Sequence, residues 1–205
     1  MIYGDMIGRW AEASPDKEAL FDAIENRRYS YRELAGEINR MAHFLQTELG
    51  IQKGDRVACL ALNRAEYIVL FFGLGRLGAV MVPLNFRLAK NEFIYFLEDA
   101  SPKAMFFDQE HQDIVSQLKD DVKLPHYVCF DDDETVGVAL PSFWDQLSDE
   151  DVAEVSITAE DPQLIIYTSG TTGLPKGVLL THGMLTWNAI NTKLGWDMRA
   201  SDRTI

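Results

Sequence analysis

The chain has little cysteine and few basic residues. Cys59 and Cys129 are its two cysteines, and they lie far apart in apolar runs without a C-x-x-C spacing. We expect both to be small core residues of a protein in a reducing compartment. Lys and Arg number 19 against 32 Asp and Glu, so the net charge is −13. Such an acidic chain is not expected to bind nucleic acid or an anionic membrane, since either partner requires a basic face.

Long apolar runs are also scarce, and the one candidate for a membrane segment is residues 67–84. Arg76 lies near the middle of this run and would cost roughly 2.5–3.5 kcal/mol at the centre of a bilayer. A buried helix followed by a buried strand explains the same residues without that cost. The N-terminus shows no basic region followed by an apolar stretch, so no secretory signal is expected. We therefore expect a soluble, cytoplasmic protein without an integral membrane segment.

The remaining composition is ordinary for a globular protein, with 47% hydrophobic and 25% charged residues. Short apolar runs alternate with segments of helical periodicity, a pattern typical of an α/β fold with a mainly parallel sheet and helices on both faces. The expected strands are residues 18–24, 27–30, 56–62, 79–82, 103–107 and 126–130, and the expected helices are residues 31–49, 63–78, 90–99 and 109–119.

Several local patterns predict how these elements begin and end. Ser30 and Glu33 have the spacing of a capping box, and residues 63–66 are expected to cap the next helix. Residues 131–134 are acidic but lack the glycine of a calcium loop, so we expect a solvated loop. The histidines before residue 182 show no spacing that indicates a partner. His182, Trp187 and Trp196 are expected to be packed residues, although His182 could act as a base and the tryptophans could border a ligand pocket.

Residues 164–182 are the most informative part of the sequence. An apolar run is followed by six residues that are only Gly, Ser or Thr (168–173), then by Pro175, Lys176 and a second apolar run. Glycines let the backbone adopt positive φ, and successive amides of such a turn can form a concave nest for an anion. The hydroxyl groups add donors, and Lys176 adds a positive charge. This pattern favours a polyphosphate ligand, but its spacing is not that of a Walker A loop.

Position for position, residues 165–176 resemble the AMP-binding signature of the adenylate-forming family, which includes acyl-CoA synthetases and peptide-synthetase adenylation domains. Residues 56–63, 67–85 and 101–107 resemble upstream blocks of the same family. Asn85 and the Gly-Thr-Thr-Gly loop favour the acyl-CoA synthetase branch, and the chain is most similar to bacterial fatty-acyl-CoA ligases. In effect, the whole chain resembles the first two-fifths of such an enzyme.

The resemblance implies a reaction, its cofactors and a set of site residues. A carboxylic acid would attack the α-phosphorus of ATP with Mg²⁺ present, and the acyl-adenylate would then pass to coenzyme A. Lys176 would be the catalytic residue that offsets charge on the leaving pyrophosphate. Thr168 would help to hold the metal. The residues implied in binding the nucleotide phosphates are Thr168, Ser169, Gly170, Thr171, Thr172, Gly173 and Lys176.

The resemblance also implies that much of the site lies beyond Ile205. We expect the N-terminal part of the large domain of the adenylate-forming fold, with an α/β subdomain at residues 1–160 and the phosphate loop with the start of the next subdomain at 161–205. A chain of this extent is expected to be inactive alone. A medium- or long-chain fatty acid is the expected substrate of the complete enzyme. The alternatives are an aryl-CoA ligase, a peptide-synthetase adenylation domain or a non-catalytic phosphate-binding module, and the sequence does not indicate the oligomeric state.

Overall fold

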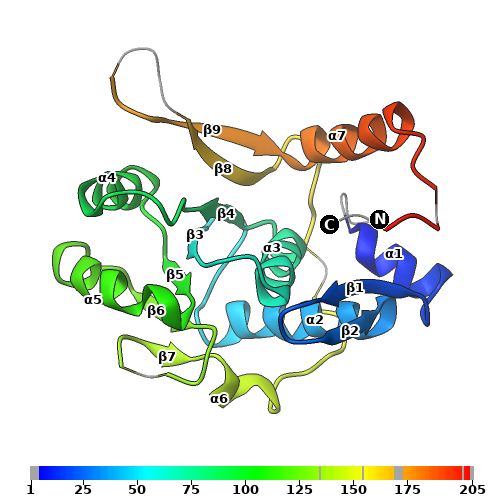
Figure 1. The fold of residues 1–205 in the computed structure, drawn as a ribbon, viewed down its shortest axis with the longest axis horizontal. Helices are drawn as coiled ribbons and strands as arrows, with labels where there is room; N and C mark the ends of the chain where they lie inside the picture. Colours follow the sequence, from blue (N-terminus) through cyan, green and yellow to red (C-terminus); the bar gives the residue numbers. More distant parts are fainter. Residues whose placement is uncertain (1–4, 134, 154, 169–172, 200, 204–205) are drawn as a thin grey trace.

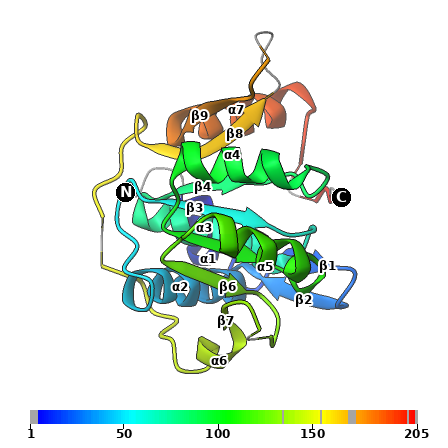
Figure 2. The same cartoon turned by 90° about the vertical axis from the view of Figure 1, so that its left-hand side faces the viewer.

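A computed structural model of the chain describes residues 5–133, 135–153, 155–168, 173–199 and 201–203. These residues form a seven-stranded sheet with the strand order β7-β6-β5-β3-β4-β8-β9. In Figure 2 the strands run across the view and are stacked from β7 near the bottom to β8 and β9 near the top. The neighbouring strands are parallel except β8 and β9, which form an antiparallel hairpin. The strands are β3 (Arg56–Leu60), β4 (Val80–Pro83), β5 (Ala104–Phe107), β6 (His126–Cys129), β7 (Val138–Ala139), β8 (Pro162–Thr168) and β9 (Lys176–Thr181).

Helices cover both faces of the sheet, as the sequence predicts (Figure 1). α2 (Tyr31–Thr47) and α3 (Ala65–Leu77) lie on one face, and α4 (Lys90–Ala100) and α5 (Gln112–Asp121) lie on the other. A 3₁₀ turn, η1 (Gln109–His111), precedes α5, so the single helix expected at residues 109–119 is divided in two. The remaining helices are α1 (Met6–Ala13), α6 (Pro141–Trp144) and α7 (His182–Gly195).

The central strands are buried on both faces because their side chains alternate between two apolar clusters. Val57 and Cys59 of β3 belong to the cluster beneath α2 and α3, whereas Ala58 and Leu60 belong to the cluster beneath α4 and α5. All four side chains are fully buried. This arrangement explains why the strands read as continuous apolar runs rather than as alternating ones. Both cysteines are buried and free, as predicted.

The N-terminal segment is a hairpin packed beside α2. β1 (Glu18–Asp22) and β2 (Arg27–Ser30) pair antiparallel, and Asn26 in their turn has a φ of 52°. The predicted capping box is confirmed: the Ser30 hydroxyl accepts from the Glu33 amide, and the Glu33 carboxylate accepts from the Ser30 amide. These two bonds satisfy donors that an uncapped helix leaves open, so they define where α2 begins.

The apolar run at residues 67–84 is a buried helix followed by a strand, as predicted. Arg76 of α3 is only 5% exposed, and its guanidinium contacts the Asn39 side chain and lies 3.5 Å from carboxylate oxygens of Asp5 and Asp151. A buried charge of this kind requires such partners. No helix in the described part of the chain has the length and apolar composition needed to cross a membrane.

The expected cap of α3 at residues 63–66 is wrong. The N-cap residue is Arg64, whose side chain makes no capping hydrogen bond. Instead, the Asp22 carboxylate at the end of β1 accepts from the Ala65 amide at 3.3 Å. The cap comes from a residue distant in sequence, so local spacing could not reveal it. The other end is as expected, since Gly78 closes α3 with a φ of 65°.

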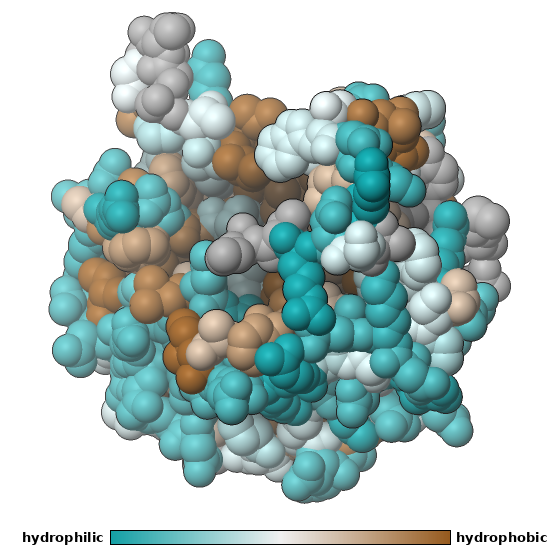
Figure 3. All heavy atoms as spheres, turned by 45° about the vertical axis from the view of Figure 1, so that its right-hand side comes forward, coloured by the Kyte–Doolittle hydropathy of each residue, from teal (hydrophilic) through white to brown (hydrophobic). Residues whose placement is uncertain are grey.

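The expected burial of Trp187 and Trp196 is also wrong. The two side chains are 61% and 75% exposed, and His182 and Gly183 are the buried residues of α7. Apolar side chains gather on the surface over α7 and β9 (Figure 3). The exposed apolar residues of this region are Val178, Leu179, Met184, Trp187, Ile190, Leu194 and Trp196. The sequence alone does not say whether another element covers the apolar residues of this region.

Candidate functional site

The β8–β9 hairpin carries the motif that the sequence analysis singled out. In the register of the two strands, Thr168 at the end of β8 is the partner of Lys176 at the start of β9. Both side chains are exposed. The predicted hydroxyl and ammonium groups therefore lie across from one another where the paired strands end. The apolar run after Lys176 forms β9.

Gly173 contributes an unusual backbone conformation between the two strands. Its φ is +105°, a region that residues with a side chain rarely adopt, and a Cβ placed there would meet no atom within 4 Å. The glycine is therefore required by its dihedral angle rather than by crowding. Ser169, Gly170, Thr171 and Thr172, the other predicted phosphate-binding residues, lie outside the described residues.

The end of α4 supports the hairpin, a contact that the sequence analysis missed. The Tyr167 hydroxyl donates to the Asp99 carboxylate at 2.6 Å, and the Tyr167 ring stacks on Phe96 at 4.1 Å between centroids. On the other side of the loop, immediately before β9, the Pro175 carbonyl accepts a hydrogen bond of 3.1 Å from the Tyr95 hydroxyl. Burial and the neighbouring Asp99 carboxylate raise the pKa of Tyr167 above its ordinary value, so the hydroxyl remains a donor at neutral pH.

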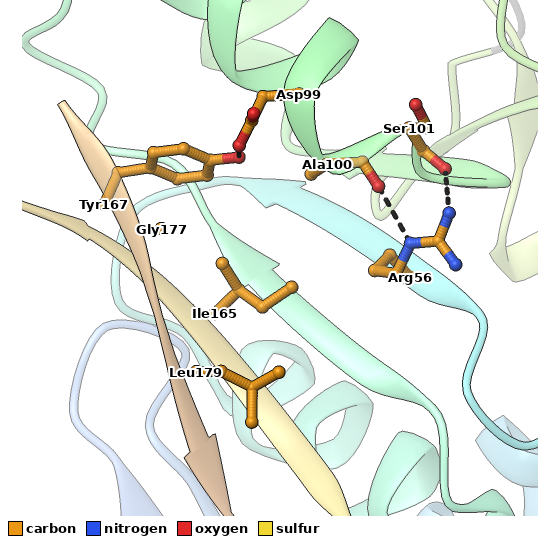
Figure 4. Close-up of a pocket in the computed structure, with 8 residues that line it drawn as sticks. All are labelled: Arg56, Asp99, Ala100, Ser101, Ile165, Tyr167, Gly177 and Leu179. Atoms are coloured by element: carbon orange, nitrogen blue, oxygen red, sulfur yellow. Dashed lines mark hydrogen bonds between the residues drawn. The ribbon is translucent and has the colours of Figure 1, made fainter. Parts of the chain in front are cut away.

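A pocket of about 310 Å³ lies beside this contact, between the hairpin and the end of α4 (Figure 4). Its walls include Ile165 and Leu179 of the hairpin and Arg56 of β3. The Arg56 guanidinium donates to the carbonyl groups of Ala100 and Ser101 at 2.8 and 2.9 Å. Because these carbonyls lie at the C-terminal end of α4, Arg56 offsets the partial negative charge of the helix end.

The segment after the hairpin is fixed by the start of α7. The Thr181 hydroxyl accepts from the Met184 amide, and the His182 amide donates to the Asp161 carbonyl at 3.0 Å. The His182 ring is buried next to Gly75 and Gln163. The expectation of a packed histidine is thus confirmed for His182.

A second polar cluster lies where β3, β5 and β6 end. The Arg64 guanidinium forms two hydrogen bonds of 3.0 Å with Asp131 and one of 2.8 Å with Glu66. Nearby, the buried Asp108 carboxylate accepts from the Leu62 amide and contacts the His111 ring. The prediction of a solvated loop is therefore wrong for Asp131, and His111 has a partner three residues away. The available signal was an acidic residue just after each of two buried strands, since Asp108 follows β5 directly and Asp131 follows β6 after one residue.

The described residues supply few ligands for a metal. No group of three or more His, Cys, Asp or Glu side chains in the described part of the chain could hold one. Near the hairpin tip, the Thr168 hydroxyl is the predicted ligand. Mg²⁺ usually retains waters and binds through one or two protein oxygens together with substrate phosphates. The Thr168 hydroxyl is therefore compatible with a metal that arrives with a polyphosphate.

The model of the AMP-binding enzyme family matches residues 7–205. The chain therefore belongs to the AMP-binding enzyme family, as the resemblance of residues 165–176 to the AMP-binding signature implies.

Relatives within this family act on different acids. An indoleacetate–CoA ligase of Aromatoleum aromaticum is 33% identical over 205 residues, which are 100% of this chain and 40% of that protein. A long-chain-fatty-acid–CoA ligase of Mycobacterium tuberculosis is 34% identical over 204 residues, covering 98% of this chain and 39% of the relative. The chain thus spans about two-fifths of the length of these relatives.

The fold is similar to that of solved structures in the same family. The structure of a fatty acyl CoA synthetase of Mycobacterium tuberculosis superposes with a TM-score of 0.77 at 32% sequence identity. The match covers 88% of this chain and 34% of the other. It agrees with the predicted α/β fold.

Proposed function

We propose that the chain is the N-terminal part of an AMP-forming acid–thiol ligase that joins a carboxylic acid to coenzyme A. The observation that carries this proposal is the hairpin tip, where Thr168 and Lys176 are register partners and Gly173 has the positive φ of a phosphate loop. Membership of the AMP-binding family supports the same conclusion. We further propose that the chain is divided into an α/β subdomain at residues 1–160 and a second part at residues 161–205. We also propose a cytoplasmic location, because the two cysteines are free and buried.

In the proposed reaction a carboxylate oxygen attacks the α-phosphorus of ATP and pyrophosphate leaves. The thiol of coenzyme A then attacks the acyl carbonyl, and AMP leaves. Residues 168–173 would donate hydrogen bonds to the β- and γ-phosphates, and Lys176 would offset the charge that grows on the pyrophosphate. The Thr168 hydroxyl would help to hold Mg²⁺, which would supply positive charge to neutralise the phosphates.

For the acid we propose a medium- or long-chain fatty acid, supported by the similarity to the long-chain-fatty-acid–CoA ligase. An aryl acid is the second candidate, because the indoleacetate–CoA ligase is similar to the same degree. A panel of both acid classes, offered to the complete ligase with ATP and coenzyme A, distinguishes the two. We favour a ligase over a non-catalytic phosphate-binding module, and an open reading frame continuing past Ile205 with the family's downstream motifs would support the ligase.

The test of this function is the Lys176→Ala variant of the complete ligase. The variant should slow ATP–pyrophosphate exchange while leaving the KM of the acid nearly unchanged, because the lysine contact strengthens as pyrophosphate leaves. Loss of one charge-assisted contact costs about 1.5–3 kcal/mol, or about ten- to a hundredfold in rate.

Lys176→Arg is the matched control, since it keeps the charge and should retain more of the exchange rate than alanine does. Lys193→Ala, a change in the last turn of α7, should leave the rate unchanged. An exchange rate that is the same in wild type and Lys176→Ala would reject the role of Lys176 in the proposed reaction.

A further inference from the structure

One helix, α4, contacts the phosphate-loop hairpin on both sides of the loop, at Tyr167 in β8 and at Pro175 immediately before β9. The Tyr167 hydroxyl donates to Asp99 at 2.6 Å, and the Tyr95 hydroxyl donates to the Pro175 carbonyl at 3.1 Å. Tyr95 and Asp99 are four residues apart and therefore lie on the same face of α4. Figure 4 shows the Tyr167 side chain reaching from the hairpin to Asp99.

The two contacts lie at equivalent positions on the two sides of the loop. Tyr167 directly precedes Thr168, and Pro175 directly precedes Lys176. Each contact is thus one residue away from a proposed phosphate-binding side chain, on opposite sides of the loop. Because the partners come from a single rigid helix, the contacts fix the two strand ends relative to each other as well as to the sheet.

The hairpin tip has little other support. β8 meets the rest of the sheet through β4, with the pair Met81 and Leu164 in register, whereas Thr168 and Lys176 lie at the far end of both strands. Strand ends that bury little apolar surface open easily. The Phe96–Tyr167 stack, with ring planes 9° apart, therefore fixes a segment that backbone pairing alone would hold weakly.

A carboxylate at the position of Asp99 is expected to destabilise α4. It is in the last turn of α4, next to the partial negative charge of the helix end, and that turn contains no basic residue. Arg56 offsets this charge by binding the Ala100 and Ser101 carbonyls. The local helix thus gives no reason for an acidic residue here, whereas the Tyr167 hydroxyl does.

We propose that Tyr95, Asp99 and Tyr167 are positioning residues that set the distance between Thr168 and Lys176 for the phosphates of ATP. We name these three residues the α4 clamp. The choice of ATP as the ligand in this inference rests on the proposed function. Its structural part, that the clamp orders the hairpin tip, is independent of that function.

The first experiment measures amide hydrogen exchange of the 205-residue chain without ligand. Tyr167→Phe and Tyr95→Phe each remove one hydroxyl and keep the ring, and each should speed exchange at the amides of Thr168, Lys176 and Gly177 by about two- to tenfold. Tyr127→Phe is the matched control, because it removes a hydroxyl bonded to the Val122 carbonyl at 2.6 Å, far from the hairpin. Unchanged exchange at the hairpin tip in both clamp variants would overturn the proposal.

The second experiment measures ATP–pyrophosphate exchange by the complete ligase. Tyr167→Phe and Asp99→Ala should raise the KM of ATP by about two- to tenfold and leave the KM of the acid unchanged, while Asp99→Asn, which keeps an acceptor, should restore part of the loss. A purely structural role would lower the active fraction, and so kcat, without moving either KM. That outcome would also overturn the proposal.

The two experiments separate failure of the clamp from failure of the proposed function. If wild-type ligase catalyses no exchange with any acid, the proposed function fails, and the hydrogen-exchange result alone decides whether the clamp orders the hairpin. If the wild type is active and the clamp variants retain its KM for ATP, the function stands and the clamp is rejected.

Discussion

Asp131 is held by three hydrogen bonds, two from the Arg64 guanidinium and one from the Gln109 amide. Partial burial tends to raise the pKa of its carboxyl group, but the bonds from Arg64 and the amide outweigh burial and lower it. The same network raises the pKa of Arg64. A single carboxylate therefore links the loops that follow β3, β5 and β6.

The predicted consequence is acid sensitivity that depends on Asp131. Because its pKa is lowered in the folded state, the carboxylate contributes stability above about pH 4, and this contribution is lost as the pH falls further. Asp131→Asn should destabilise the chain by about 1–2 kcal/mol at pH 7, since Arg64 loses a charged partner in a partly exposed site. Urea unfolding at pH 7 and pH 3 measures the difference, which should shrink at the lower pH.

Asp16→Asn is the control for this prediction. Asp16 pairs with Arg32 at 3.2 Å, but both side chains are largely exposed, so its loss should be nearly neutral. A difference between wild type and Asp131→Asn that stays constant from pH 7 to pH 3 would contradict the assigned role of the charge.

Single residues of the candidate site were predictable only where a local motif carries them. Gly173 and Lys176 could be named because their spacing in the loop resembles that of a known family. Tyr95 and Asp99 could not, because their contacts with the hairpin join segments that are distant in the sequence. The same reason hid the partners of Asp131.

At the scale of secondary-structure elements, the backbone conformation of Gly78 determines how α3 ends. Gly78 has a φ of 65°, and a Cβ at this position would lie 3.0 Å from Cγ of Lys53. Its amide donates to the carbonyls of Gly75 and Leu74, which the helix leaves without partners. The turn into β4 therefore depends on a left-handed residue.

Gly78→Ala should lower the free energy of unfolding by about 1–2 kcal/mol, the cost of a left-handed conformation for a residue with a Cβ. Gly36→Ala is the matched control, because Gly36 lies inside α2 and its added Cβ would make only an ordinary contact, 3.6 Å from Cβ of Asp149. That change should stabilise by about 0.5–1 kcal/mol. Chemical denaturation measures both, and a neutral Gly78→Ala would show that the turn tolerates another conformation.

Most helices and strands could be predicted because the burial of their apolar side chains and the local preference of their residues favour the same structure. The strands β3 to β6 are buried on both faces and read as apolar runs, and α2 has a local capping box. The start of α3 was mispredicted because Asp22, from another element, supplies the cap. Local patterns determine where an element lies, whereas tertiary contacts decide some of its ends.

At the scale of the whole molecule, the chain spans about two-fifths of the length of its relatives. Large apolar side chains of α7, including Trp187 and Leu194, are exposed. Their exposure could not be predicted, because the sequence can indicate an apolar helix face but not what covers that face.

The 205-residue chain alone should form no acyl-CoA thioester. The hairpin proposed to bind phosphate is present, but the chain spans only about two-fifths of the length of its relatives, so much of what the complete enzymes contain has no counterpart in it. The assay supplies ATP, Mg²⁺, coenzyme A and a panel of fatty and aryl acids, and follows pyrophosphate and thioester. Turnover by the purified chain above that of its Lys176→Ala variant would contradict this prediction.

The strand order also has a consequence for how the chain folds. β3 pairs with β4 across α3 alone, and with β5 across α3, β4 and α4, but Met81 of β4 and Leu164 of β8 are farther apart in the sequence. Closing a long loop costs more chain entropy than closing a short one, and non-local pairings form slowly. The β8–β9 hairpin is local within itself, so it can form early as an isolated unit. Its docking onto β4 is the most non-local pairing of the described sheet, so Thr168 and Lys176 take their positions beside α4 only when that step is complete.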